Sequence, residues 1–143
     1  MAYLARREYS RAELRTKLVA TGATRDEADA VLDEITGLGY LSDARFATAL
    51  VRQKSGTMST RAISSSLKAK GVPDDVVSEA IAGSEVDDHD AMVALWSRKF
   101  GAPPANEREK ARQVRFLRSR GFSLSAIFKL LRDPPSDGDS KPG

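Results

Sequence analysis

The sequence reads YSRAELRTKLVATGATRDEADAVL over residues 9–32 and MSTRAISSSLKAKGVPDDVVSEAI over residues 58–81, and these two stretches decide the fold. In each of them a serine stands twelve residues before a glycine, which is Gly22 in the first stretch and Gly71 in the second. The match continues on both sides of the glycine. It identifies the two stretches as copies of one structural unit.

A third, weaker copy is centred on Gly121. All three copies carry a leucine four residues before the glycine and an apolar residue six after it: Leu18, Leu67 and Leu117, then Ala28, Val77 and Ile127. The third copy departs from the pattern at Gln113, where the first two have Leu14 and Ile63. Three copies at a spacing of about 50 residues predict a repeat protein.

Each copy predicts two helices that meet at the glycine. Ser10 with Glu13, and Thr24 with Glu27, have the spacing of capping boxes, which begin helices. Apolar residues recur at helical spacings without strand-like alternation, so the chain is expected to be all-α. A further helix precedes each pair, in AYLARRE, DARFATALVRQK and DAMVALWSRKF.

Nine helices in three tandem three-helix repeats are therefore expected, stacked into an elongated, curved body. The predicted repeats cover 1–52, 53–100 (with a first helix beginning near 42) and a degenerate 101–133 (with a first helix beginning near 87). Residues 134–143 are expected to be a disordered tail, because prolines and polar residues dominate there.

The composition favours the cytoplasm and a soluble protein. The chain has no cysteine, so disulfides are excluded, and it has no apolar run of the roughly 18 residues that a membrane helix needs. Its start, MAYLARREYS, lacks the apolar core of a signal peptide.

Charge is distributed in blocks although the net charge is only +3. Residues 44–71 carry six basic and no acidic side chains, whereas residues 72–90 carry seven acidic and no basic ones. Residues 107–132 carry eight basic and two acidic side chains. Such blocks indicate an organised surface rather than random solvation.

An enzyme is disfavoured, and no catalytic, metal-binding or cofactor-binding residues are predicted. The only histidine, His89, stands among Asp87, Asp88 and Asp90, but adjacent residues of a helix point in different directions and cannot converge on one ion. We interpret this segment as a solvated helix entry. No phosphate-binding glycine loop or nucleophile motif appears.

The basic helices are the better candidates for function. Arg108, Arg112 and Arg115 fall at i, i+4 and i+7, within a stripe about 60° wide that suits phosphate or carboxylate oxygens. The alternative is an ordinary solvated face, neutralised by nearby acidic helices. The candidate contacts to a partner or to DNA are Arg11, Arg15, Lys17, Arg45, Arg52, Arg61, Lys68, Lys70, Arg108, Lys110, Arg112, Arg115, Arg118 and Arg120.

Five aromatic residues in the last third of the chain are interpreted as core rather than as base-stacking platforms. They are Trp96, Phe100, Phe116, Phe122 and Phe128.

Two motifs carry a resemblance to a known family. LARREYSRAELRTKL (residues 4–18) and the corner GYLSDARFA (residues 39–47), followed by degenerate helical triplets, resemble the RecX family of recombination regulators over residues 3–132. The resemblance implies a non-catalytic protein that lodges in the groove of the RecA recombinase filament on DNA. It would suppress ATP hydrolysis, strand exchange and co-protease stimulation, and so act in recombinational repair and the SOS response.

Within that resemblance, the corner would be the joint between two repeats. Tyr40, Leu41 and Phe46 are expected to pack there, with Asp43 at a helix start. A monomer is expected, with contact to single- or double-stranded DNA through phosphates left open.

Two other functions also stay open. One is a helix-turn-helix DNA-binding protein that uses residues 17–32, although the carboxylates of its second helix would repel phosphate. The other is an α-solenoid scaffold for a different protein.

Overall fold

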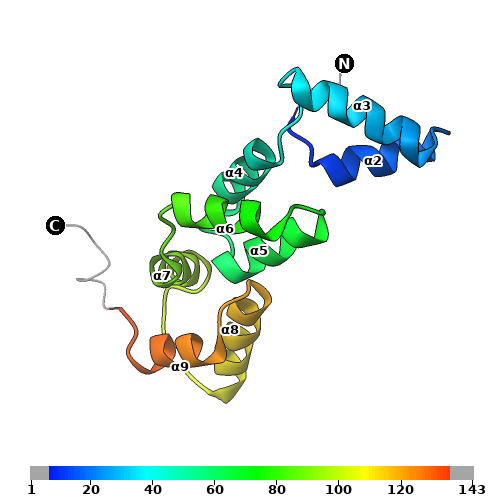
Figure 1. The fold of residues 1–143 in the computed structure, drawn as a ribbon. Helices are drawn as coiled ribbons and strands as arrows, with labels where there is room; N and C mark the ends of the chain where they lie inside the picture. The colour runs from blue at the N-terminus through cyan, green and yellow to red at the C-terminus, as the bar shows by residue number, and fades with distance from the viewer. Residues whose placement is uncertain (1–6, 136–143) are drawn as a thin grey trace. The chain divides into compact units, whose positions relative to one another are not determined.

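The computed structural model describes residues 7–135, all of whose regular elements are α-helices (Figure 1). The eight described helices are α2 (Arg11–Ala20), α3 (Arg25–Gly37), α4 (Asp43–Lys54), α5 (Thr60–Ala69), α6 (Asp74–Gly83), α7 (Asp88–Lys99), α8 (Glu107–Ser119) and α9 (Leu124–Arg132). The all-α prediction is confirmed. The expected first helix falls largely on residues 1–6, and most of the expected tail on residues 136–143; both lie outside the described residues.

The chain divides into two compact units. The first contains residues 1–53 and 63–85, and the second contains residues 54–62 and 86–143. The boundary falls inside α5, whose first three residues belong to the second unit.

In the first unit, α2 lies against α3, and both helices begin as the sequence predicts (Figure 1). Ser10 and Thr24 each accept a hydrogen bond from the backbone N–H three residues on, and a glutamate bonds back to the cap. Gly22 joins the helices with φ of 110°, a left-handed conformation that favours glycine. The buried core here consists of Tyr9, Leu14, Leu32, Ile35 and Leu41.

The corner at residues 39–47 places Asp43 at the start of α4, as expected, but departs from expectation at one residue. Gly39 has φ of 84°, and the Ser42 hydroxyl accepts a hydrogen bond from the Arg45 N–H to begin α4. Leu41 and Phe46 are buried, but Tyr40 is 61% exposed, so the prediction that Tyr40 packs is wrong. Residues 40–42 are not helical, and within them Leu41 is buried while its neighbour Tyr40 is exposed.

Helices α4, α5 and α6 bury the apolar positions of the second copy. The buried side chains are Phe46, Ala47, Val51, Ile63, Leu67 and Val77. Pro73 stands one residue before α6, at its N-cap, where its missing N–H costs nothing.

The second unit has its own core, formed by α7, α8 and α9. Trp96 and Phe122 lie in it with Leu117 and Ile127, and Phe100 and Phe116 pack against it partly buried. Phe128 is 43% exposed, so the interpretation of the aromatic residues as core fails at that position.

Gln113 is buried in the second unit, and its polar atoms are all used. Its carbonyl oxygen accepts a 2.8 Å hydrogen bond from the Trp96 indole N–H, and its amide donates to the Ala102 carbonyl at 3.1 Å. The residue that breaks the repeat pattern is thus the partner of the single tryptophan. A leucine here would leave the indole N–H without an acceptor.

Equivalent hydrogen bonds are formed at the start of α2 in the first unit and at the start of α5 in the second. Ser10 donates its hydroxyl to the carbonyl of Lys70, and Ser59 donates to that of Gly121, both at 2.8 Å. Asp43 and Asp88, each the first residue of its helix, accept the first backbone N–H of α2 and of α5 at 2.9 Å. The sequence repeat is therefore also a repeat of polar contacts.

Candidate partner-binding surface

Three of the candidate arginines lie together on α8. Arg108, Arg112 and Arg115 are exposed and line one surface hollow with Asn106 and Glu109. Asn106 caps α8 by accepting a hydrogen bond from the Glu109 N–H at 2.9 Å. The helical spacing predicts this arrangement, and the three guanidinium groups share one side of the helix.

Three cations in or near this stripe lie against aromatic rings. The Arg112 guanidinium lies 5.6 Å from the centre of the Phe100 ring. Lys99 and Arg120 lie 5.4 Å and 5.1 Å from the centre of the Phe116 ring. The two rings meet edge to face, with their centres 5.5 Å apart. Each cation is attracted by the negative face of a ring.

In the first copy the candidate arginines are paired with carboxylates. Arg11 contacts Asp33 at 2.8 Å, and Arg15 contacts Asp29 at 2.9 Å. The hydrogen bond from Arg15 lowers the pKa of Asp29 and raises that of Arg15. Helix α3 thus neutralises the basic face of α2, as the alternative of a neutralised solvated face expects.

The remaining candidates of the first unit have mixed surroundings. Arg45 reaches Glu8 at 3.3 Å and also donates to the Gly39 carbonyl at 2.8 Å. The longer ion pairs are Lys70 with Glu13 at 3.8 Å and Lys68 with Asp74 at 4.0 Å. Lys17 lies 5.9 Å from the Tyr9 ring centre, and Arg52 is exposed.

The remaining candidates of the second unit are either exposed or ring-supported. Arg61 and Arg118 are exposed, and Lys110 lies 5.7 Å from the centre of the Phe128 ring. Arg120 also donates to the Thr57 carbonyl at 3.4 Å.

The two units therefore differ in whether their cations are paired with carboxylates. Within residues 7–135, every ion pair joins residues of the first unit, and no cation of the second unit has a carboxylate within 4.0 Å. Helix α9 carries Lys129 and Arg132 but no acidic residue, so it cannot neutralise α8 as α3 neutralises α2.

Sequence reasoning missed Lys99. It ends α7 and is followed at once by Phe100, and the Gly101–Pro104 break after them folds this pair back against α8. The available signal was a lysine–aromatic pair at a helix end, which is too common to single out.

The region around His89 is a helix entry, as predicted. Asp87 caps α7 by accepting the Asp90 N–H, and Asp88 binds the Thr60 N–H and hydroxyl. In the described part of the chain, no group of three or more His, Asp or Glu residues is arranged to hold a metal ion. None of the described helices combines the length and apolar character needed to cross a membrane.

Fold and surface together define a class of protein. The chain is an assembly of helical repeats joined by internal hydrogen bonds, and in the described part of its second unit the cations form no ion pair. Such an arrangement suits binding to a large charged partner.

Comparison with known proteins identifies the family. The models of the first, second and third three-helix domains of RecX match residues 1–34, 42–81 and 85–131. The chain is 37% identical to the regulatory protein RecX of Ralstonia nicotianae, covering 97% of this chain and 89% of that one. It is 40% identical to the RecX of Leptothrix cholodnii, covering 92% and 84%. The crystal structure of RecX from Lactobacillus salivarius shares the fold with a TM-score of 0.71, at 19% identity over 92% of this chain and 89% of that one.

The chain belongs to the RecX family of non-catalytic regulators of the RecA recombinase.

Proposed function

We propose that this protein binds the RecA filament on DNA, lodges in its helical groove and bridges neighbouring protomers. In that position it would suppress ATP hydrolysis, strand exchange and co-protease stimulation. The observation that carries the proposal is the match of all three RecX three-helix domains, which together span most of the chain. We further propose that it acts as a monomer in the cytoplasm.

The surface supports this function through α8. A filament on DNA presents acidic protein groups and phosphates. Arg108, Arg112 and Arg115 are exposed, and none of them pairs with a carboxylate of residues 7–135. Arginine binds both kinds of oxygen through its planar fork of N–H groups.

The helix-turn-helix alternative gains no support from the surface. Its second helix would be α3, which exposes Asp26, Glu27, Asp33 and Glu34. These carboxylates would repel the phosphates of a DNA groove.

The test is ATP hydrolysis by RecA on single-stranded DNA, with this protein added well below one molecule per recombinase protomer. We expect strong suppression at such ratios, because a molecule in the groove acts on several protomers. An unchanged rate, with the protein folded and helical by circular dichroism, would overturn the proposal.

A charge-reversal variant tests the role of α8. Arg108→Glu with Arg112→Glu and Arg115→Glu should weaken filament binding at unchanged helicity. The matched control reverses three exposed cations outside the candidate surface, as Arg25→Glu with Lys129→Glu and Arg132→Glu. Equal binding by the two triple variants would remove α8 from the interface.

A further inference from the structure

We propose that the cations held on Phe100 and Phe116 bind the phosphodiester backbone of DNA. We call Lys99, Arg112 and Arg120 the ring-held cations. The inference rests on the proposed function in that it names the ligand of one part of the same surface. It assigns DNA contact to the second unit and adds Lys99, Phe100 and Phe116 to the site.

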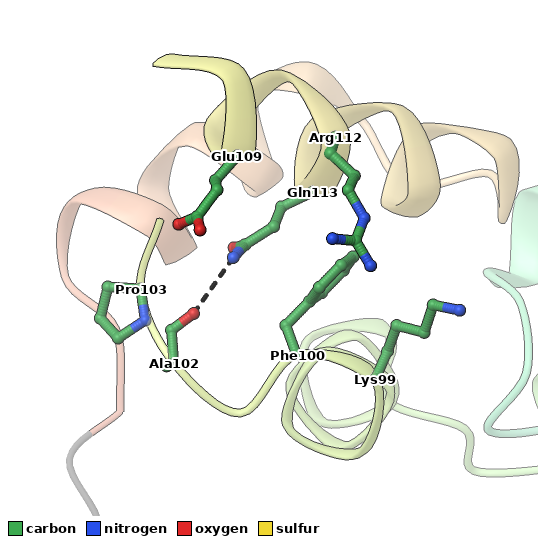
Figure 2. Close-up of a pocket in the computed structure, with 7 residues that line it drawn as sticks. All are labelled: Lys99, Phe100, Ala102, Pro103, Glu109, Arg112 and Gln113. Atoms are coloured by element: carbon green, nitrogen blue, oxygen red, sulfur yellow. Dashed lines mark hydrogen bonds between the residues drawn. The ribbon is translucent and has the colours of Figure 1, made fainter. Parts of the chain in front are cut away.

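The ring-held cations all lie against one edge-to-face ring pair. Arg112 lies over Phe100, while Lys99 and Arg120 lie over Phe116, at 5.1 to 5.6 Å from the ring centres. Figure 2 shows the Arg112 guanidinium beside the Phe100 ring, on the same side as Lys99. Positive charges held in this way lose less conformational freedom on binding than free surface chains.

The nearby carboxylate forms no ion pair with them. Glu109 lines the same hollow, but its carboxylate accepts a 2.6 Å hydrogen bond from the Ala105 N–H. In Figure 2 it points toward Ala102 and Pro103, away from the Arg112 guanidinium. Three cations with one carboxylate nearby leave a net positive charge, which attracts anions.

The length of the charged row favours a polyanion over a single phosphate. Arg108, Arg112, Phe116 and Arg120 follow one another at i, i+4 spacing, so this row rises about 18 Å along the helix axis, at 1.5 Å per residue, while it turns around α8. DNA carries one negative charge per about 1.7 Å of duplex axis, so several phosphates fall within that length.

The scarcity of exposed apolar surface favours DNA over an acidic protein segment. Protein interfaces combine charge with an apolar centre. Among the described residues of the second unit, the large exposed apolar side chains are Leu124 and Phe128, both on α9. Phe100 and Phe116 are partly buried beneath the cations. Arginine seated on a ring still directs N–H groups outward to phosphate oxygens.

The test is binding of a fluorescently labelled single-stranded oligonucleotide to the full chain, without recombinase, across a salt titration. Lys99→Gln with Arg112→Gln and Arg120→Gln should flatten the log–log salt dependence by about 2, at about 0.7 for each lost phosphate contact. The matched control, Arg25→Gln with Lys129→Gln and Arg132→Gln, removes equal charge and should keep the parent slope. Equal slopes for the two variants, or an unmodified protein that binds no DNA, would overturn the inference.

A ring variant tests the positioning role. Phe116→Leu removes the surface on which Lys99 and Arg120 rest, and should weaken DNA binding several-fold, whereas Phe116→Tyr keeps the ring and should restore it. Thermal unfolding by circular dichroism accompanies each variant. If Phe116→Leu does not fold, the Phe100→Leu and Phe100→Tyr pair gives the same comparison for Arg112. Parent-like affinity in a folded leucine variant would contradict the role of the rings.

The RecA assay separates this inference from the proposed function. A protein that suppresses ATP hydrolysis but binds no free DNA would overturn only the DNA assignment. If the triple glutamine variant loses binding to recombinase in the absence of DNA, the ring-held cations contact protein instead, and the assignment is wrong. If free DNA is bound through these cations but hydrolysis is unchanged, the inference stands and the proposed function fails.

Discussion

The Ser59 hydroxyl donates a 2.8 Å hydrogen bond to the carbonyl oxygen of Gly121 and accepts one of 3.1 Å from the N–H of Ala62. One side chain therefore begins α5 and fastens the turn between α8 and α9. Ser10 does the same for α2 and the carbonyl of Lys70. Both serines are buried, which explains why the sequence repeat is clearest at these positions.

Ser59→Ala should lower the free energy of unfolding by about 1.5–3 kcal/mol, since it removes a helix cap and leaves the partly buried Gly121 carbonyl without this partner. Urea unfolding followed by circular dichroism measures the change. Ser65→Ala, at an exposed position inside α5, is the matched control and should change stability little. Equal effects of the two substitutions would show that the contact with Gly121 contributes nothing.

Gly121→Ala should destabilise more than Gly22→Ala, although both glycines have positive φ. A Cβ at Gly121 would overlap Ser59 Oγ and Ala62 Cβ, whereas a Cβ at Gly22 meets no atom within 4 Å. We expect a loss of about 1 kcal/mol at Gly22 from backbone strain, and about 3 kcal/mol or more at Gly121 because overpacking adds to it. Thermal unfolding of the two variants provides the comparison, and similar losses would contradict the packing argument.

Gln113→Leu restores the apolar repeat pattern but should still destabilise the protein by about 1–3 kcal/mol, because the Trp96 N–H then lies buried without an acceptor. Adding Trp96→Phe removes that unpaired donor. The double variant should therefore lose less than the sum of the two single losses, which a double-mutant cycle measures. Strict additivity would show that the hydrogen bond does not couple the two side chains.

Asp29 should make the stability of the fold depend on pH in the acid range. The pKa of Asp29 is lowered in the folded state, chiefly by the hydrogen bond from Arg15. Its contribution to the free energy of unfolding is therefore present above the unfolded pKa, about 3.9, and is lost as the pH falls below that value. Asp29→Asn should lower stability at neutral pH and reduce the further loss between about pH 4 and pH 2. Arg15→Gln should have the same effect on the pH profile, and the double variant should add little. Urea unfolding at several pH values tests this, and a parent-like profile for Asp29→Asn would contradict it.

The helical architecture was predictable because its signals are local. Capping pairs such as Ser10 with Glu13, and glycines such as Gly71 with φ of 83°, act within one turn of the chain and can be recognised by spacing alone. The exposure of Tyr40 was missed for the opposite reason. Which side of a short non-helical segment faces the core depends on what packs there, and spacing does not specify it.

The candidate surface was predictable only in part. The stripe of Arg108, Arg112 and Arg115 follows from helical geometry. That it has no carboxylate partner among the described residues depends on which helix packs beside α8. Arg11 and Arg15 have the same spacing and are neutralised by α3. Equal sequence patterns thus give unlike surfaces, because tertiary neighbours decide whether a cation is available.

Trp96, whose indole N–H is hydrogen-bonded to Gln113, is an internal fluorescence probe. The chain has one tryptophan, and it is buried entirely within the second unit. Its emission will therefore follow the loosening of that unit alone, while circular dichroism sums over all helices. A difference between the two unfolding curves would show that the units come apart in separate steps, and coincident curves that they unfold as one.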